Sequence, residues 1–338
     1  MLRFSSLGDI IMGTAMIRCL RTAFPDAQID MVVRADFLDL IRFNPHLNQK
    51  IGLPRASGIK GVRNLLRQIN HEQYDLIYDA HRSLRTLCMM PFLKARQKVY
   101  FKKNYVRRSL ALTFKLPLLR NVTRMLIRYI EPLIPFGVRF DNRGPEIFID
   151  EASRQSAKIK LGRALPAGSG PVVGLIPSAQ WPGKRWPLPY FRTLLETLVR
   201  ETPYPVIIFG GKEDSFCGPL VEGLPVDRIL NTQGRLTIAE SAAMVERCQL
   251  VVANDTGLMH VADALDIPCV VVLGPTSKEM GCLPFHRQSE IVEKSLWCRP
   301  CSKNGQGPCI RFGNRVCLNS IGPEAVFARV EQLVKRLA

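Results

Sequence analysis

The sequence predicts an α/β protein built from two doubly wound, Rossmann-like domains that face a cleft. In both halves of the chain, short apolar strands alternate with helices, which is the rhythm of a parallel sheet. The 338 residues are 46% hydrophobic, enough length and apolar content for two cores. Asp141–Pro145 is polar and turn-rich, as a linker would be. We therefore expect domains at 1–150 and 151–338, with the last helix as a segment that can pack back on the first domain.

Each expected strand of the first half is followed by a helix or a helical pattern. The expected strands are Leu2–Ser5, Gln28–Val33 and Leu76–Asp79. The expected helices are about Asp9–Ala23, which Pro25 ends, about Val62–Asn70, and a helix-like pattern over Asn121–Leu133.

The second half repeats this rhythm more cleanly. The expected strands are Val172–Ile176, Val206–Phe209, Leu250–Val252 and Cys269–Leu273. The expected helices are Leu188–Arg200, Thr237–Arg247 and Thr256–Leu265, and Thr237 with Glu240 forms a capping box for the second of them. Ligands of such a sheet bind at the carboxyl ends of its strands.

Charge is concentrated in the first half of the chain. Of the total net charge of +18, residues 1–165 contribute 29 Lys and Arg against 13 Asp and Glu, a net charge of +16. Residues 82–128 hold 13 basic residues and no acidic one. A solvated basic face is the plain explanation of a charge run, but it usually includes acidic residues. The segment therefore favours an anionic partner: a phosphorylated lipid, a membrane surface or nucleic acid.

The chain gives no sign of a membrane span, because no apolar run reaches ~18 residues. Ile10–Ile17 has the length of a signal-peptide core, but Asp9 before it and Arg18 and Arg21 after it argue against one. We expect a cytoplasmic protein whose ten cysteines are mostly reduced.

The most informative segment lies where a predicted strand meets a helix, at Asp255, Thr256 and Gly257. Backbone N–H groups and the helix dipole at that point favour an anion, typically a phosphate. Gly257 lets a ligand approach the backbone, and His260 lies one turn into the helix. The alternatives are a plain turn with Asp255 as the N-cap, and a His260 that only packs in the first turn.

Three more motifs accompany this segment: Phe4-Ser-Ser-Leu-Gly-Asp9, Pro177-Ser-Ala-Gln-Trp-Pro-Gly-Lys-Arg-Trp-Pro187 and Leu273-Gly-Pro-Thr276. In this order and at this spacing they resemble the family 9 glycosyltransferases, the heptosyltransferases that build the inner core of lipopolysaccharide. The resemblance covers essentially the whole chain. It implies the GT-B fold, in which two Rossmann-like domains face a cleft.

In the resembled family, the aspartate of the first motif is regarded as the catalytic base, which here is Asp9. Inverting glycosyl transfer needs a carboxylate that takes the proton of the acceptor hydroxyl. A helix N-terminus lowers a carboxylate pKa and so weakens the base, unless the proton moves late in the step. The alternative is that Asp9 is only an N-cap.

The resemblance also implies a donor site. Lys184 lies in a proline-rich loop between Trp181 and Trp186 and matches the family's phosphate-binding lysine. The implied donor-binding residues are Ser178, Lys184, Glu213, Asp255, Thr256, Gly257 and His260. The alternative for Glu213 is that it belongs to an ordinary helix start, which Gly-Gly followed by acids also forms.

The activity implied is inverting transfer of heptose from ADP-L-glycero-β-D-manno-heptose to the lipopolysaccharide inner core, with no metal or other cofactor. Arg107, Arg108 and Arg124 would bind the phosphorylated acceptor, with the protein peripheral on the inner face of the cytoplasmic membrane. One alternative is a family 9 enzyme that uses another nucleotide sugar. The other is a non-catalytic relative that binds anionic lipid or nucleic acid, although the chain carries no zinc-finger or RNA-recognition signature.

Four cysteines lie in a Gly- and Pro-rich segment near the C-terminus: Cys298, Cys301, Cys309 and Cys317. Four thiols in twenty residues could hold structural zinc, but only the first pair has the usual ligand spacing. We favour reduced thiols that pack in the fold.

Overall fold

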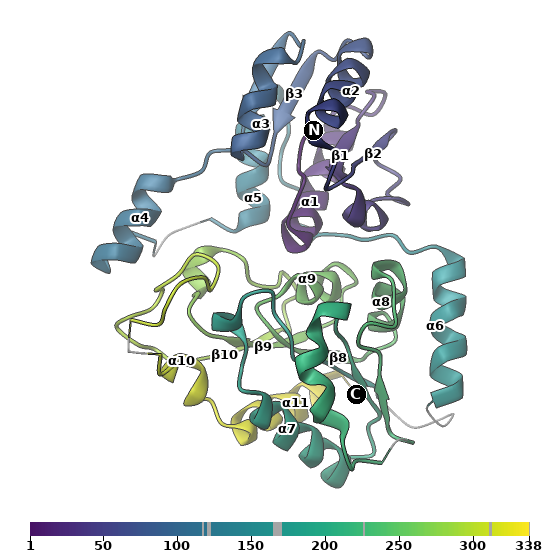
Figure 1. Ribbon diagram of the computed structural model, residues 1–338, viewed down its shortest axis with the longest axis vertical. Coiled ribbons are helices and arrows are strands. Elements are labelled where there is room, and N and C mark those ends of the chain that lie inside the picture. The colour runs from purple at the N-terminus through teal and green to yellow at the C-terminus, as the bar shows by residue number, and fades with distance from the viewer. Residues whose placement is uncertain (117, 120–122, 165–170, 226, 311–312, 338) are drawn as a thin grey trace. The chain divides into compact units, whose positions relative to one another are not determined.

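The computed structural model describes residues 1–338 except 117, 120–122, 165–170, 226, 311–312 and 338 (Figure 1). It divides into two compact units. The first comprises Met1–Tyr105 and Thr123–Phe148, and the second comprises Val106–Val122 and Ile149–Ala338. The chain therefore passes from one unit to the other next to the expected boundary. The assignment of residues 106–122 to the second unit was not expected from the sequence.

The second unit is built on a six-stranded parallel sheet in the order β10-β9-β8-β5-β6-β7. The strands are β5 (Val173–Ile176), β6 (Val206–Ile208), β7 (Ile229–Asn231), β8 (Leu250–Asn254), β9 (Cys269–Leu273) and β10 (Glu290–Glu293). The four strands expected in this half are confirmed, whereas β7 and β10 were not expected. The strand order reverses between β5 and β8, which is the topological switch point of a doubly wound fold.

Helices cover both faces of this sheet. They are α6 (Glu151–Ala164), α7 (Leu188–Glu201), α8 (Ile238–Val245), α9 (Gly257–Ala264), α10 (Val316–Asn319) and α11 (Pro323–Leu337). Leu250 and Val252 of β8 share a core with α7 and α11, while α9 packs on β8 and β9 (Figure 1). Alternate residues of a strand point to opposite faces, and every residue of β8 is buried, so Leu250–Ala253 forms a continuous apolar run that ends at Asn254. The last helix, α11, packs against α7 inside this unit.

The first unit has a shorter parallel arrangement. Its strands form the pairs β1 (Met31–Arg34) with β2 (Lys50–Leu53) and β3 (Leu76–Asp79) with β4 (Gln97–Tyr100). Its helices are α1 (Leu7–Ala23), α2 (Gly58–His71), α3 (Leu84–Met89) and α5 (Met125–Ile130), with short 3-10 turns at Ala35–Leu40, Met90–Phe92 and Glu131–Phe136. The helices expected at 9–23 and 62–70 and the strand Leu76–Asp79 are confirmed.

Two expectations for the first unit were wrong in detail. Leu2–Ser5 is not a regular strand: Leu2 alone forms bridges, to Val32 of β1 and Asp79 of β3. It nevertheless fills the place between them, since its N–H donates to the carbonyl of Tyr78 at 2.9 Å. The helix expected over Asn121–Leu133 begins only at Met125 and gives way to a 3-10 turn at Glu131, where Pro132 follows; residues 120–122 lie outside the described part.

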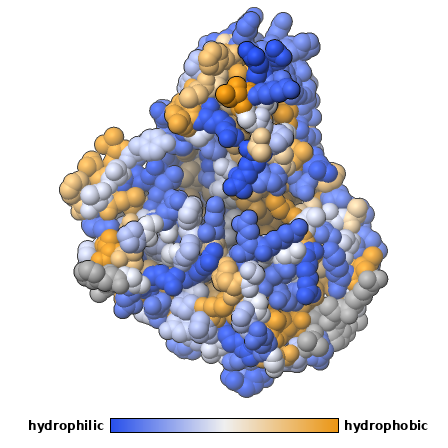
Figure 2. Space-filling model, in the orientation of Figure 1, coloured by the Kyte–Doolittle hydropathy of each residue, from blue (hydrophilic) through white to orange (hydrophobic). Residues whose placement is uncertain are grey.

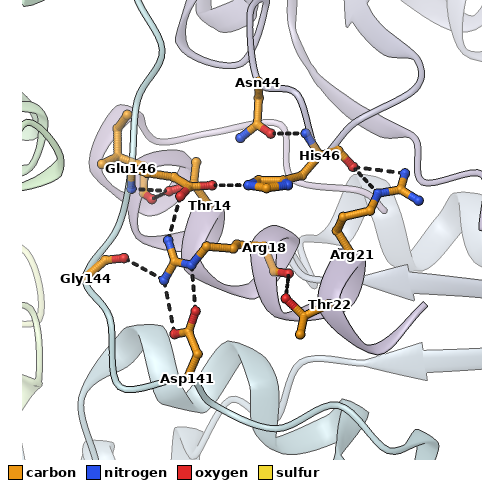
Figure 3. A network of polar contacts seen from close by, with 10 residues as sticks. Thr14, Arg18, Arg21, Thr22, Asn44, His46, Asp141, Gly144 and Glu146 are labelled. Atoms are coloured by element: carbon orange, nitrogen blue, oxygen red, sulfur yellow. Dashed lines mark hydrogen bonds and ion pairs between the residues drawn. The ribbon is translucent and has the colours of Figure 1, made fainter. Parts of the chain in front are cut away.

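Arg18 fastens α1 to the segment that leads out of the first unit (Figure 3). Its guanidinium bonds Asp141 at 2.6 Å, Glu146 at 2.7 Å and the carbonyl of Gly144 at 3.0 Å. Thr14, one turn earlier, accepts a hydrogen bond from the backbone of Glu146 at 2.8 Å. The predicted linker is thus held to a buried helix, because Asp141 within it and Glu146 just after it are the counter-ions of a buried arginine.

Glu240 connects α8 to α6. The predicted capping box is confirmed: the N–H of Thr237 donates to Glu240 at 2.9 Å, and the N–H of Glu240 donates to the Thr237 hydroxyl at 3.1 Å. Lys160 and Ser156 of α6 each bond the same Glu240 oxygen at 2.7 Å. Burial acts to raise the pKa of Glu240, but these partners outweigh it and lower the pKa to about 2.

We predict that Glu240→Gln lowers the free energy of unfolding by about 1–2 kcal/mol at pH 7, since glutamine keeps the capping geometry but loses the charge opposite Lys160. The folded-state pKa lies below the unfolded one, so the unfolded state takes up the proton first as pH falls. The difference between variant and wild type should therefore be full above about pH 4.5 and shrink towards pH 2.

Urea unfolding at a series of pH values measures this difference. Glu201→Gln is the matched control, because its pair with Arg200 is exposed and should contribute less than ~0.5 kcal/mol. A loss for Glu240→Gln that persists unchanged at pH 3 would contradict the ion-pair explanation.

Candidate active site

Asp9 lies in the first turn of α1, next to the end of the extended segment Met1–Phe4. The N-cap of this helix is Ser6, so the alternative that Asp9 is the N-cap was wrong. Asp9 instead accepts hydrogen bonds from the Ser6 hydroxyl at 2.7 Å and the Ser6 N–H at 3.3 Å. The Ser-Ser-Leu-Gly-Asp motif therefore builds a tight turn in which the serine holds the aspartate.

Two residues that the sequence did not single out complete the setting of Asp9. Arg3 contacts Oδ2 at 2.6 Å, and the hydroxyl of Tyr129 on α5 donates to Oδ1 at 2.8 Å. Burial acts to raise the pKa of Asp9, but the charge of Arg3 and the hydrogen bonds from Ser6 and Tyr129 hold it well below its usual range. Asp9 is thus ionised at any ordinary pH, and it is a weak base until a very acidic proton is offered.

Arg3 itself is nearly buried and donates to the carbonyl of Ala80 at 2.7 Å. Its cation also lies over the Tyr129 ring, 5.3 Å from the centroid. An arginine within an apolar segment that is expected to be a strand is a sequence signal that could have found it, because a buried charge needs an acid nearby. Tyr129 lies 120 residues from Asp9, and no local pattern connects them.

In the second unit, the expected donor-binding residues follow the strands on either side of the switch point. Ser178 and Lys184 come after β5, and Asp255 comes after β8, which is the neighbour of β5. Glu213 follows β6, the next strand, and is exposed. Because parallel strands end at one edge, these loops lie at the edge where doubly wound folds bind ligands.

Lys184 and Asp255 form an ion pair of 2.7 Å, with side chains only 15% and 11% exposed. The Thr276 hydroxyl of the Leu-Gly-Pro-Thr motif donates to the same Asp255 oxygen at 2.7 Å. Burial acts to raise the pKa of Asp255, but Lys184, Thr276 and His260 together lower it. Three of the sequence motifs therefore meet at one carboxylate.

The start of α9 also settles one alternative. Its N-cap is Thr256, so the expectation that Asp255 is the N-cap was wrong. Gly257 is the first residue of the helix, and His260 is buried in its first turn, close enough to Asp255 to lower its pKa. Ser178 is likewise buried.

Asn254, the last residue of β8, is a further residue that the sequence reasoning missed. The oxygen of its buried side-chain amide accepts a hydrogen bond from the backbone N–H of Trp186 at 2.9 Å, and the NH₂ group donates to the Pro177 carbonyl at 2.8 Å. It therefore fastens both ends of the Pro177–Pro187 loop to the strand that carries Asp255. The signal was available: an asparagine that ends an apolar buried strand needs partners.

The loop is also held from the C-terminal side. Trp186 is buried, and its indole N–H donates to the Ile321 carbonyl at 2.8 Å. The guanidinium of Arg185 donates to the Ala179 carbonyl and stacks on the Phe216 ring. Gly183 and Gly305 touch so closely that a Cβ on Gly183 would lie 2.4 Å from the Gly305 oxygen. Lys184 thus projects from a loop with little freedom to move.

The four C-terminal cysteines lie near one another, since each of the other three raises the pKa of Cys317. Burial is the largest cause of the raised pKa of Cys301 and of Cys317. All four are free thiols, and no group of three or more potential ligands placed to hold a metal ion occurs in the described part of the chain.

The three arginines expected at an acceptor site do not share one unit. Arg107 and Arg108 lie on α4 (Tyr105–Phe114) in the second unit, and Arg124 precedes α5 in the first. Arg107 donates to the Leu118 carbonyl at 2.6 Å. Among the described helices, none is both long and apolar enough to cross a membrane.

Comparisons with known proteins bear on this arrangement. The model of glycosyltransferase family 9 (heptosyltransferase) matches residues 62–307. Lipooligosaccharide heptosyltransferase 2 of Haemophilus influenzae is 26% identical over 288 residues, which are 81% of this chain and 82% of that protein.

Solved structures share the fold over nearly the full length. The family 9 glycosyltransferase of Veillonella parvula superposes with a TM-score of 0.83 at 23% identity, covering 99% of this chain and 96% of that one. The Escherichia coli ADP-heptose lipopolysaccharide heptosyltransferase II gives a TM-score of 0.77 at 22% identity, covering 99% and 98%. The expected GT-B fold class and the resemblance in the motifs are both confirmed. The chain belongs to glycosyltransferase family 9, the heptosyltransferases, and is a transferase.

Proposed function

We propose that this protein is an inverting glycosyltransferase that moves heptose from ADP-L-glycero-β-D-manno-heptose to the inner core of lipopolysaccharide. The observation that carries the proposal is the position of Lys184, held by a braced loop beside the N-terminus of α9 at the switch point of the sheet. A fixed cation and a helix N-terminus together suit a diphosphate. The choice of heptose as the transferred sugar rests on two relatives that are named as heptosyltransferases.

In the proposed reaction, the acceptor hydroxyl attacks the anomeric carbon of the heptose while the bond to the ADP oxygen breaks. The leaving diphosphate takes the negative charge, and Lys184 with the backbone N–H groups of Thr256 and Gly257 stabilises it. Asp255 would accept hydrogen bonds from sugar hydroxyls, and His260 would donate to the leaving group. No cofactor is part of this proposal.

Asp9 would accept the proton of the attacking hydroxyl. With its pKa held low by Arg3 and Tyr129, Asp9 takes that proton only after the oxygen has begun to bond to carbon and has become strongly acidic. The same low pKa keeps the carboxylate ionised and ready throughout the neutral range.

The direct test is to incubate the protein with a panel of nucleotide sugars and core-truncated lipopolysaccharide, and to read the product by mass spectrometry. The proposal predicts that the lipopolysaccharide gains one heptose residue when ADP-heptose is the donor, and that no other nucleotide sugar of the panel yields a product. A product with another nucleotide sugar would establish the alternative donor. Absence of transfer from every donor would favour a non-catalytic relative.

We predict that Asp9→Asn lowers turnover by a factor of at least ~100, the usual scale for a lost general base, and leaves ADP affinity near wild type. Asparagine still meets Tyr129, so thermal unfolding should show a folded protein. Steady-state kinetics and calorimetry with ADP measure the two effects. Asp36→Asn, at an exposed ion pair with Arg34, is the control and should keep wild-type turnover. Turnover of Asp9→Asn within a few-fold of wild type would exclude the base.

Lys184→Ala should weaken ADP binding by roughly 10- to 100-fold, as expected for a lost charge-assisted hydrogen bond. The variant also leaves Asp255 without its cation, which by itself could repel a phosphate. The double variant Lys184→Ala with Asp255→Asn removes that repulsion. If calorimetry shows that ADP affinity stays low in the double variant, Lys184 binds the phosphate directly; restored affinity would contradict direct binding. Lys212→Ala, an exposed lysine, is the control.

The acceptor would be met by the basic segment at a membrane surface, with the protein cytoplasmic and peripheral. On α4, Val106, Leu110 and Phe114 are spaced along one helical stripe and are 73%, 39% and 65% exposed. Figure 2 shows hydrophobic side chains over α4. Apolar side chains beside Arg107 and Arg108 suit an anionic lipid interface.

We predict that the triple variant of Arg107, Arg108 and Arg124 to glutamate raises the KM for the lipid acceptor and weakens binding to vesicles that contain anionic lipid. The KM for the nucleotide sugar should stay nearly unchanged. The acceptor effect should shrink as salt rises, because screening acts over ~8 Å at physiological salt. The same charge change at Lys158, Arg200 and Lys335, all exposed, is the control. Loss of donor affinity with intact acceptor affinity would contradict the assignment.

A further inference from the structure

His81 lies beside Asp9 although the sequence separates them by 72 positions. It lies two residues after the end of β3, and Leu2 bridges to Asp79, the last residue of that strand. The extended segment Met1–Phe4 and β3 therefore end side by side, at the edge of the sheet where Asp9 begins its helix. The charge of Asp9 is one of the influences on the pKa of His81.

The backbone fixes which nitrogen of His81 carries the proton. The N–H of Phe4 donates to Nδ1 at 3.0 Å, and the N–H of Ser5 reaches it at 3.4 Å. A nitrogen that accepts hydrogen bonds cannot hold a proton, so the proton of the neutral ring is on Nε2. The Asp79 carboxylate holds the backbone that carries His81, because it accepts hydrogen bonds from the backbone N–H groups of His81 at 3.0 Å and Arg82 at 2.7 Å.

The surroundings keep the ring neutral. Burial, then the charges of Arg3, Lys103 and Arg85, lower the pKa of His81 to about 4, and Asp9 opposes them only in part. The side chain is still partly exposed, and Nε2 has no hydrogen-bond partner among the residues that the structure describes. The ring thus presents one N–H donor of fixed direction, close to the carboxylate that we propose as the base.

We propose that the Nε2–H of His81 donates a hydrogen bond to an oxygen of the acceptor sugar and so positions that sugar at Asp9. The proposal rests on the proposed transfer reaction, and it assigns His81 to the acceptor rather than to the donor. Asp9 cannot fill this role, because an ionised carboxylate only accepts. A neutral donor beside it lets the site bond a sugar through both a donor and an acceptor.

Two amide variants separate this role from a merely structural one. In His81→Asn, the amide oxygen can take the place of Nδ1 and accept from Phe4, but nothing replaces Nε2–H. In His81→Gln, the longer side chain can place its NH₂ near the position of Nε2, but the acceptor for Phe4 is lost. If His81 only holds the turn, asparagine should preserve function better than glutamine; if it binds the acceptor, the order reverses.

We expect His81→Asn to raise the KM for core-truncated lipopolysaccharide about 10-fold, with the KM for ADP-heptose unchanged, and His81→Gln to recover part of the loss. Equal losses in both variants, or better function with asparagine, would overturn the proposal. Calorimetric binding of the same lipopolysaccharide without donor repeats the comparison independently of turnover. If wild type transfers nothing, the proposed function fails, whereas the proposal for His81 still stands or falls by this binding.

A measurement on the wild-type protein guards against variants that fold poorly. With ¹⁵N-labelled histidine, the Nε2 resonance of His81 should shift when core-truncated lipopolysaccharide is added and stay in place when ADP is added. An Nε2 resonance that does not move at saturating acceptor would overturn the proposal.

Discussion

The parallel alignment of the strands is the constraint on which two arrangements depend, the one around Asp9 in the first unit and the one around Lys184 in the second. Because all strands of a unit end at one edge, loops far apart in the sequence meet there without any special motif. In the second unit this edge joins the loop after β5 to the turn after β8, and Asn254 locks the two together. In the first unit it sets the end of β3 beside the start of α1, with Leu2 bridging the gap. The topology of the strands therefore determines which loops meet, and the residues of those loops need only have suitable side chains.

Both units place an ionised carboxylate opposite a cation, with different consequences. Asp9 is compensated by Arg3, a residue held by its own backbone contact, so its charge is permanent and its basicity low. Asp255 is compensated by Lys184, which stands on a loop at the site itself. An arginine with a fixed planar fork suits a lasting pair, whereas a lysine is a point charge that can change partners. The first pair therefore fixes the position of Asp9, and in the proposed reaction the second pair would open towards the diphosphate.

Much of this could be predicted from the sequence, because the apolar strands of the second unit are buried on both faces and read as continuous runs; Cys269–Leu273 matches to the residue. The first unit was harder. Leu2–Ser5 has the composition of a strand, yet only Leu2 bridges, since the turn that serves Asp9 begins at once. Residues 121–133 have helical spacing, but Pro132 limits the helix. Tyr129 reaches Asp9 from 120 residues away, and the periodicity of a sequence cannot report such a contact.

In the proposed reaction, Lys184 would exchange Asp255 for the diphosphate and would take the role that a metal ion plays elsewhere. A diphosphate that approaches α9 would compete with Asp255 for the lysine, and the loss of that ion pair would oppose binding. Asp255 would keep the hydrogen bond from Thr276, and hydroxyl groups of a bound sugar would donate the hydrogen bonds that replace its contact with Lys184. A donor that brings both diphosphate and sugar would satisfy both partners, whereas a bare nucleotide would satisfy only one. The ion pair would therefore favour a complete nucleotide sugar over its product, which helps the product to leave.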